Sequence, residues 1–230
     1  MSKIYISTTD VEEFKEIFCD ENKIIKDILQ KHFLDVLKGR VVDVGSGIAD
    51  ILSDVLPNEE VIHLDILDFS STPIPKRHRR IQGDFLNTNL IDTLKPLDLL
   101  FMSHVHQFLD TNMPTLHTAI RTASAKAIIL VEDLNDDFLG EVMNFSVSHF
   151  KDANPEVQIQ NFPEGYTKTK SIPFTALLTC KNFHSLAKQC LYLMDLLHSE
   201  ENMEKMKKFL EEKLSEPTFT INQAVTLYQK

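Results

Sequence analysis

The stretch VVDVGSGIAD, residues Val41–Asp50, decides the fold of this chain. Its first residues are apolar apart from one acid, and they predict a short strand that is covered on both faces. Two glycines follow directly, and apolar residues at helical spacing then continue as far as Pro57. Proline ends a helix because it lacks a backbone N–H and clashes with the preceding turn. The stretch therefore predicts a strand, a tight glycine turn and a short helix.

The same pattern of a buried strand followed by a return connection recurs along the chain. Strands alternating with helical patterns are typical of parallel sheets with helices on both faces. We therefore expect an α/β fold with a doubly wound, mostly parallel, seven-stranded sheet whose last strands are antiparallel. The further strands are EVIHLDI ending at Asp65, HRRIQGDF ending near Asp84, LDLLFMSH ending near Ser103 and AKAIILVED ending near Glu132.

The two ends of the chain add helices to this core. Apolar residues between Val11 and Leu37 predict two helices that are broken near CDEN, residues 19–22. Toward the other end, VQIQNF and SIPFTALLTC are separated by a loop only and could form an antiparallel pair. We predict a single domain with N-terminal helices at 1–39, a core at 40–182 and a C-terminal extension of two helices and a strand at 183–230.

Composition limits the classes of function. The 24 basic and 34 acidic residues give a net charge of −10, which disfavours nucleic acid as a partner because such binders neutralise phosphates with Lys and Arg. One basic stretch, PIPKRHRR at Pro73–Arg80, is interpreted as a solvated loop that enters the next strand. The sequence has no apolar run of the roughly 20 residues that a membrane span needs, and we expect no secretory signal.

The three cysteines, Cys19, Cys180 and Cys190, lack the spacing of metal ligands. We interpret them as reduced thiols, predict no metal site and expect a cytoplasmic protein.

The glycine turn, which follows a strand and opens a helix, is in the structural context of a ligand-binding turn. A dinucleotide site of the G-x-G-x-x-G type would need glycine where this chain has Asp50, whose charge would face the pyrophosphate. A Walker A loop requires G-x-x-x-x-G-K-[ST], which the sequence lacks. NAD and nucleotide triphosphates are therefore disfavoured as ligands.

An acid two residues before the first glycine, followed by GSGIA, resembles the first motif of the class I S-adenosylmethionine-dependent methyltransferases. Ala49 replaces the third glycine, a mild departure at a position that mainly allows close packing of helix on strand. The resemblance implies the Rossmann-like methyltransferase fold and S-adenosylmethionine as cofactor. It implies that Asp65 holds the ribose hydroxyls and that Ile66 and Asp84 lie at the adenine. The cofactor residues that it implies are Asp43, Gly45, Ser46, Gly47, Asp65, Ile66, Asp84, Phe85 and Ser103.

The fourth strand ends in SHVHQFLD, at the edge where open α/β sheets bind their ligands. His106 and His104 are the candidate catalytic residues, because histidine is the usual general base near neutral pH. Glu132 could hold a cationic group of the acceptor, and Tyr166 in the loop PEGYTKTK could cover the site. The N-P-P-Y-like motif of enzymes that methylate amino groups of bases or glutamine is absent here.

The sequence thus predicts a methyltransferase that transfers a methyl group to N or O of a small-molecule acceptor, in a biosynthetic pathway. Two alternatives stay open, a methyltransferase that acts on protein and a protein that binds S-adenosylmethionine without turnover. The extra C-terminal helices and strand could also form the contact of a homodimer.

Overall fold

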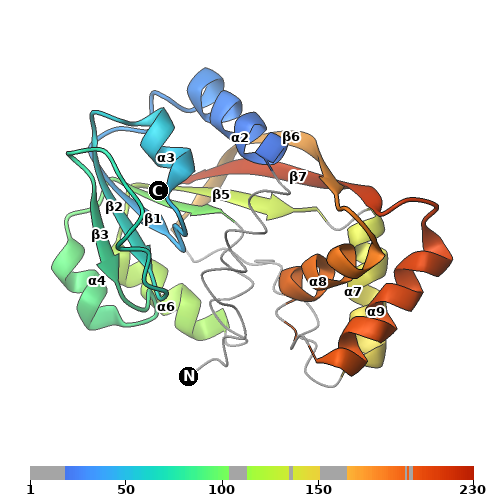
Figure 1. Cartoon of the computed structure of the whole chain (residues 1–230). Coiled ribbons are helices and arrows are strands. Elements are labelled where there is room, and N and C mark those ends of the chain that lie inside the picture. Colours follow the sequence, from blue (N-terminus) through green and yellow to red (C-terminus); the bar gives the residue numbers. More distant parts are fainter. Residues whose placement is uncertain (1–18, 104–112, 135–136, 151–164, 195, 197–198) are drawn as a thin grey trace.

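A computed structural model describes residues 19–103, 113–134, 137–150, 165–194, 196 and 199–230. A seven-stranded sheet with the order β3-β2-β1-β4-β5-β7-β6 runs through the molecule (Figure 1). The first five strands are parallel, and β7 is antiparallel to both of its neighbours. The strands are β1 (Arg40–Val44), β2 (Glu60–Asp65), β3 (Arg79–Gln82), β4 (Leu99–Ser103), β5 (Ala127–Asp133), β6 (Thr167–Thr179) and β7 (Thr218–Gln229).

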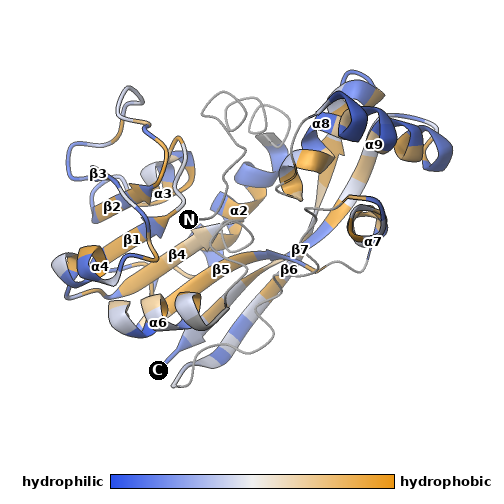
Figure 2. Cartoon of the chain, turned by 90° about the horizontal axis from the view of Figure 1, so that it is seen from below, coloured by the Kyte–Doolittle hydropathy of each residue, from blue (hydrophilic) through white to orange (hydrophobic). Residues whose placement is uncertain are grey.

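Alternation along each strand sends side chains to two helical layers, one on each face of the sheet. Val42 and Val44 of β1 belong to the apolar cluster under α4 (Thr88–Leu94) and α6 (Met113–Ala123). Val41 belongs to the opposite cluster, under α2 (Cys19–His32) and α3 (Asp50–Val55). This strand is apolar from Val41 to Val44 apart from Asp43, and it is buried on both faces, as its sequence predicts. Figure 2 shows the apolar strands lying between these helices.

A third apolar cluster lies at the far ends of β6 and β7, under α7 (Phe138–His149), α8 (Phe183–Leu193) and α9 (Glu200–Lys213). Stacked rings of Phe138, Phe145 and Phe209 join α7 to α9, with centroids 4.2 and 6.1 Å apart. The three helices form a lobe at one end of the sheet (Figure 1). We call this group the α7–α9 lobe.

The structure confirms the predicted doubly wound, mostly parallel sheet with antiparallel last strands. CDEN forms the first turn of α2, with acids at the positions that favour a helix N-terminus, and the helix predicted before it lies outside the described residues. β6 pairs antiparallel with β7, while the segment 157–162, a predicted candidate partner of β6, lies outside the described residues. Since β7 is inserted between β5 and β6, the sheet draws on the segment that we had assigned to a C-terminal extension.

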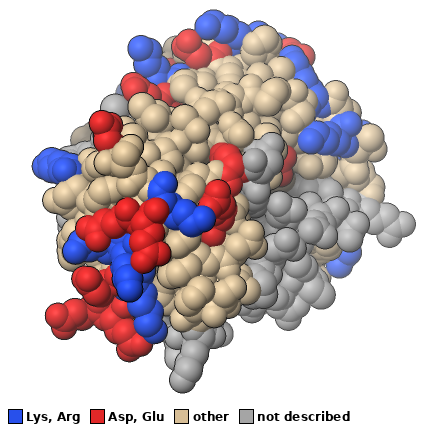
Figure 3. All heavy atoms as spheres, turned by 90° about the vertical axis from the view of Figure 1, so that its right-hand side faces the viewer, with Lys and Arg blue, Asp and Glu red and all other residues tan. Residues whose placement is uncertain are grey.

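The surface over α9 carries charges of both signs. Lys205 pairs with Glu201, and Lys207 lies 3.7 Å from Glu211. Figure 3 shows acidic and basic side chains intermingled on this face, so it presents no extended field of one sign. Within the described part of the chain, no helix has the length and apolarity that crossing a membrane demands.

Gly39 lies directly before β1, and its substitution tests the fold. Its φ is +80°, and a Cβ there would overlap the carboxylate of Asp98, which accepts a hydrogen bond from Arg40 N at 2.9 Å. Gly165 has φ +93° with open space around it. Both alanine variants carry the strain of a left-handed backbone, about 1–2 kcal/mol, but only Gly39→Ala also displaces Asp98.

We therefore expect Gly39→Ala to lower the free energy of unfolding by at least about 1 kcal/mol more than Gly165→Ala does. Denaturant titration of both variants measures this difference. Equal losses would show that Asp98 moves aside at no cost.

Candidate functional site

The carboxyl ends of β1, β2, β4 and β5 meet at one edge of the sheet, since these strands are parallel. The chain passes from β1 outward to β2 and β3 and then returns to β4 on the other side of β1. This reversal is a topological switch point, where open α/β sheets bind ligands. Ser103 follows Met102, the register partner of Val44, so β1 and β4 end side by side there.

The glycine turn at this edge winds through the left-handed region. Gly45, Gly47 and Ala49 have φ values of 66°, 52° and 65°. Glycine adopts this backbone without strain, whereas the Cβ of Ala49 has a steric cost there. The third position of the motif, Ala49, therefore needs a residue that can adopt a left-handed backbone. This is a second requirement, beside the close packing of helix on strand that the sequence predicts.

The backbone N–H groups of the turn point inward. Gly45 N and Ser46 N donate to Leu64 O at 2.8 and 3.4 Å, and Ala49 N donates to Ser46 O at 2.8 Å. Gly47 N donates to the Asp65 carboxylate at 2.8 Å. These donors are therefore occupied by the protein itself and are not presented to an anion.

Asp65 ends β2 beside this turn, half-buried. One carboxylate oxygen accepts from Gly47 N and the other from Leu67 N, at 2.8 and 2.9 Å. Burial raises the pKa of this carboxyl, while the two backbone N–H groups oppose that rise. Each oxygen has a second lone pair, so the carboxylate can still accept hydrogen bonds from a ligand.

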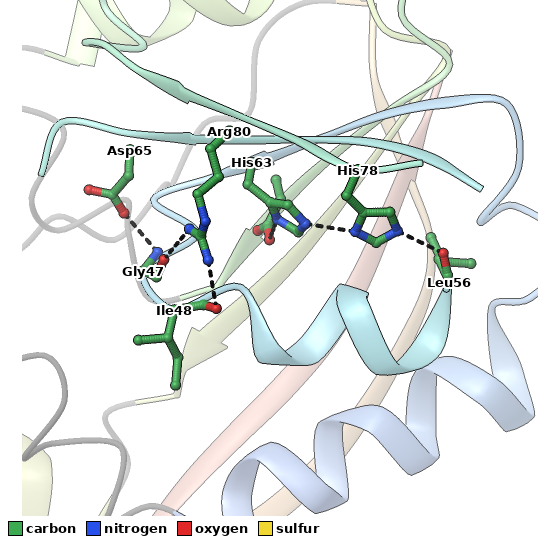
Figure 4. A network of polar contacts seen from close by, with 8 residues as sticks. Gly47, Ile48, Leu56, His63, Asp65, His78 and Arg80 are labelled. Carbon is green, nitrogen blue, oxygen red and sulfur yellow. Dashed lines mark hydrogen bonds and ion pairs between the residues drawn. The ribbon is translucent and has the colours of Figure 1, made fainter. Parts of the chain in front are cut away.

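Arg80 of β3 holds the other side of the turn. Its Nη1 donates to Gly47 O and its Nη2 to Ile48 O, both at 2.9 Å (Figure 4). Burial lowers the pKa of the guanidinium, and the carboxylates of Asp43 and Asp65 oppose that shift. The planar fork of arginine suits two neighbouring acceptors, which a lysine could not bridge in the same way.

Asp43 lies beneath the turn with only 4% of its surface exposed. Its Oδ2 is 2.8 Å from His63 Nδ1, and His63 Nε2 is 2.9 Å from His78 Nδ1. His78 Nε2 then donates to Leu56 O, at the end of α3, at 2.9 Å (Figure 4). The acid predicted to bind the cofactor thus contacts a chain of buried histidines.

The remaining predicted cofactor residues differ in position. Ile66 follows β2 and is 43% exposed, which leaves an apolar side chain open beside Asp65. Asp84 is exposed after β3, and its carboxylate accepts from Leu86 N at 2.8 Å. Phe85 is buried in the cluster under α4 and α6, so its ring is part of the core.

The structure does not bring Tyr166 to this edge. Its hydroxyl donates to Ala125 O at 2.6 Å, just before β5 begins, whereas the site lies where β5 ends. The strand between these ends is about 20 Å long at roughly 3.3 Å per residue. Tyr166 therefore cannot cover the site from this position, and its prediction as a substrate-binding residue is corrected.

Glu132 lies near the carboxyl end of β5, half-buried, and accepts from Thr226 Oγ1 at 2.9 Å. His104 and His106 lie outside the described residues. Among the residues that are described, no group of His, Cys, Asp and Glu side chains could hold a metal ion. Cys180 and Cys190 are free and buried, and burial raises the pKa of the Cys180 thiol to about 11.

Three residues of the site, His63, His78 and Arg80, are not among those predicted from the sequence. The last two lie in the stretch interpreted as a solvated loop, yet His78 is 7% exposed and Arg80 binds the turn. The available signal was His63, a polar residue inside an otherwise apolar strand. A buried polar side chain needs a partner, and such a residue indicates one on a neighbouring strand.

No protein-family model matches this sequence, and a search of curated proteins finds no match. Solved structures do match. A cyclopropane-fatty-acyl-phospholipid synthase-like protein from Lactobacillus casei superposes with a TM-score of 0.59 at 11% identity, covering 94% of this chain and 93% of its own. An O-methyltransferase family protein from Burkholderia thailandensis has a TM-score of 0.43 at 14% identity, covering 59% of this chain and 46% of its own.

The solved structures that match include class I S-adenosylmethionine-dependent methyltransferases. The fold of this chain is therefore the Rossmann-like methyltransferase fold, and the resemblance predicted from the glycine turn and the ordered acids is confirmed for the fold. The first superposition carries this conclusion, because it spans nearly the whole of both chains.

The fork of Arg80 can be tested against its neighbour Arg79, which is exposed on the same strand. Arg80→Lys keeps the charge but cannot reach both carbonyls, so we expect a loss of about 1–3 kcal/mol in the free energy of unfolding. Arg79→Lys should stay within about 0.5 kcal/mol of the unaltered protein. Urea unfolding compares the two, and similar small changes in both would show that the fork is dispensable.

Proposed function

We propose that this protein is an S-adenosylmethionine-dependent methyltransferase that acts on a small-molecule acceptor. The glycine turn and Asp65 would hold the cofactor, and the acceptor would approach the ends of β4 and β5. The proposal combines the fold with the chemistry of the turn.

The orientation of the turn's N–H groups carries this proposal. A phosphate site at a glycine turn uses free N–H groups and the N-terminus of a helix. Here Leu64 O, Ser46 O and Asp65 occupy the donors of Gly45, Ser46, Gly47 and Ala49, and α3 is only six residues long. A ligand that is recognised through hydroxyl groups and not through phosphate fits this turn.

The residues present suit an adenosine bound through its ribose. Asp65 offers carboxylate lone pairs to vicinal hydroxyls, and charge-assisted hydrogen bonds are roughly twice as strong as neutral ones. Ile66 offers an exposed apolar surface next to it for the base. S-adenosylmethionine, when bound, supplies an electrophilic methyl group on its sulfonium.

The other residues would place the acceptor and manage its proton. Methyl transfer is an in-line displacement, which depends above all on orientation. We propose that His106 or His104, after β4, orients the acceptor or accepts its proton. Glu132, held by Thr226, would contribute a negative charge near the end of β5.

Two measurements test the proposal. Calorimetry should detect binding of S-adenosylmethionine and S-adenosylhomocysteine but not of NAD. Incubation with methyl-labelled S-adenosylmethionine and fractionated extracts should then place label in a small-molecule fraction. Label in the protein fraction would instead support a protein methyltransferase, and binding without transfer would support a protein that only binds the cofactor. Tight NAD binding alone would refute the proposal.

Asp65→Ala tests the ribose contact. We expect S-adenosylhomocysteine affinity to fall by about 1–3 kcal/mol, which is roughly ten- to a hundredfold in Kd. The variant also loses the acceptor of Gly47 N and Leu67 N, so its unfolding midpoint should fall, and the affinity is measured well below that midpoint. Asp68→Ala is the matched control, since Asp68 is exposed and makes the same kind of turn with Ser70 N at 2.9 Å. Equal affinities in both variants would move the ribose contact elsewhere.

The histidines after β4 are tested by His104→Ala and His106→Ala, made separately. If one of them is the general base, turnover should fall by about 10²–10⁴-fold while S-adenosylhomocysteine affinity stays nearly constant. The rate of the unaltered enzyme should also fall as the pH drops through the ordinary histidine pKa of about 6.5. His32→Ala, at an exposed position ending α2, serves as the control. Native rates in both variants would show that neither histidine is a general base and that catalysis depends on the positioning of the two reactants alone.

A further inference from the structure

A row of polar side chains crosses three strands beneath α3. Asp43 is the register partner of His63, and His63 is the register partner of Arg80. Partners in register project to the same face of a sheet, so the three side chains lie together under the helix. His63 is 1% exposed and His78 7% exposed, and the proposed function uses neither ring.

The hydrogen bonds along this row fix the number of protons that it holds. Leu56 O can only accept, so His78 Nε2 must carry a proton. The bond between His78 Nδ1 and His63 Nε2 needs a second proton, and the bond between His63 Nδ1 and Asp43 Oδ2 needs a third. Two neutral imidazoles carry only two protons. The chain of three bonds is therefore complete only with one additional proton. This proton makes the trio of Asp43, His63 and His78 electrically neutral.

The third proton lies between His63 and Asp43. Burial lowers the pKa of His78, although its bond to Leu56 O and the charge of Asp43 oppose this, so the ring is neutral at neutral pH. Its Nδ1 then accepts, and His63 Nε2 donates to it. The charges facing the trio are Arg80 from β3 and Asp65 from β2, which have opposite signs.

The helix above the trio carries two carboxylates that share one cation. Asp50 and Asp54 of α3 lie 3.6 and 2.6 Å from Lys26 Nζ of α2, and Asp54 is exposed to solvent. Asp43 is the carboxylate that contacts His63, so it is the group that the extra proton neutralises.

We propose that His63 and His78 are positioning residues that hold Asp43 and the end of α3 in the geometry of the glycine turn, by means of this one shared proton. Asp43 is two residues before Gly45, and Leu56 O ends the helix that the turn opens. The trio thus fastens both flanks of the turn. The effect on cofactor binding rests on the proposed function, but the proton itself does not.

Loss of the proton at alkaline pH should loosen the turn. Two protons cannot fill three contacts, so one contact of 2.8–2.9 Å would then have lone pairs on both of its atoms. The two groups of that contact must separate, which moves Asp43 or turns one of the two rings. We therefore expect affinity for S-adenosylhomocysteine to decrease with the loss of this proton.

The first test measures unfolding against pH in the protein without cofactor. Above pH ~6.5 the unfolded chain holds two protons on the trio while the folded chain holds three. Stability then decreases with rising pH, and the unfolding equilibrium constant rises by up to tenfold per pH unit. Below pH ~6.5, His78 changes the stability in the opposite direction. Its lowered pKa makes the folded state less stable as the pH falls.

Asp43→Asn is the decisive variant. Its Nδ2–H can donate to a neutral His63 Nδ1, which completes the chain without the additional proton. We expect the alkaline slope to flatten in this variant. Asp98→Asn is the matched control, because Asp98 is bound by Lys126 and Arg40 N outside the trio and should keep the alkaline slope. Equal alkaline slopes in the unaltered protein and Asp43→Asn would overturn the proposal.

The second test observes the ring nitrogens by NMR. At neutral pH, His63 should carry protons on both nitrogens and His78 on Nε2 only. A singly protonated His63 at neutral pH would overturn the proposal. Calorimetry with S-adenosylhomocysteine should show affinity falling in the pH range where the unfolding and NMR measurements show loss of the third proton. Affinity that stays constant through this loss would remove the positioning role. Absence of binding at every pH would refute the proposed function, while the unfolding and NMR results would still decide the shared proton.

Discussion

The forked hydrogen bond from Arg80 to Gly47 O and Ile48 O is the interaction on which the site depends. A turn with left-handed residues at 45, 47 and 49 gives up the repeating hydrogen bonds of a helix, and its carbonyl groups need other donors. One guanidinium supplies both donors at once. Its bonds connect the turn to β3, so the shape of the glycine turn depends on a strand 33 residues further along the chain.

This dependence makes the register of the short β3 important. Arg80 faces the turn because it pairs with His63, and a shift of one residue would direct its side chain to the opposite face. The same register places His78 within reach of His63 Nε2 and Leu56 O. Arg80 of β3 and His78 just before this strand therefore make two separate attachments, one to the turn before α3 and one to the end of that helix.

Sequence predicted the elements that periodicity and glycine reveal, namely the strands, the turn after β1 and the acids at the ends of β2 and β3. It did not predict the side-chain contacts between neighbouring strands. Asp43 and His63 are neighbours only because of the register between β1 and β2. The sequence of a single strand does not determine that register. Tyr166 was misplaced for a related reason, because its position in a polar loop says nothing about which edge of the sheet that loop joins.

The two halves of the molecule also differ in what their sequence can disclose. The half with the glycine turn depends on backbone geometry, which only a few residue types permit, so glycines and strand-end acids mark it. The α7–α9 lobe depends on apolar packing around Leu186, Cys190 and Leu191, and many apolar residues could fill such a cluster. A core that tolerates such substitution leaves no motif in the sequence. The fold was therefore predictable from ten residues, whereas the acceptor of the proposed reaction has to be found by experiment.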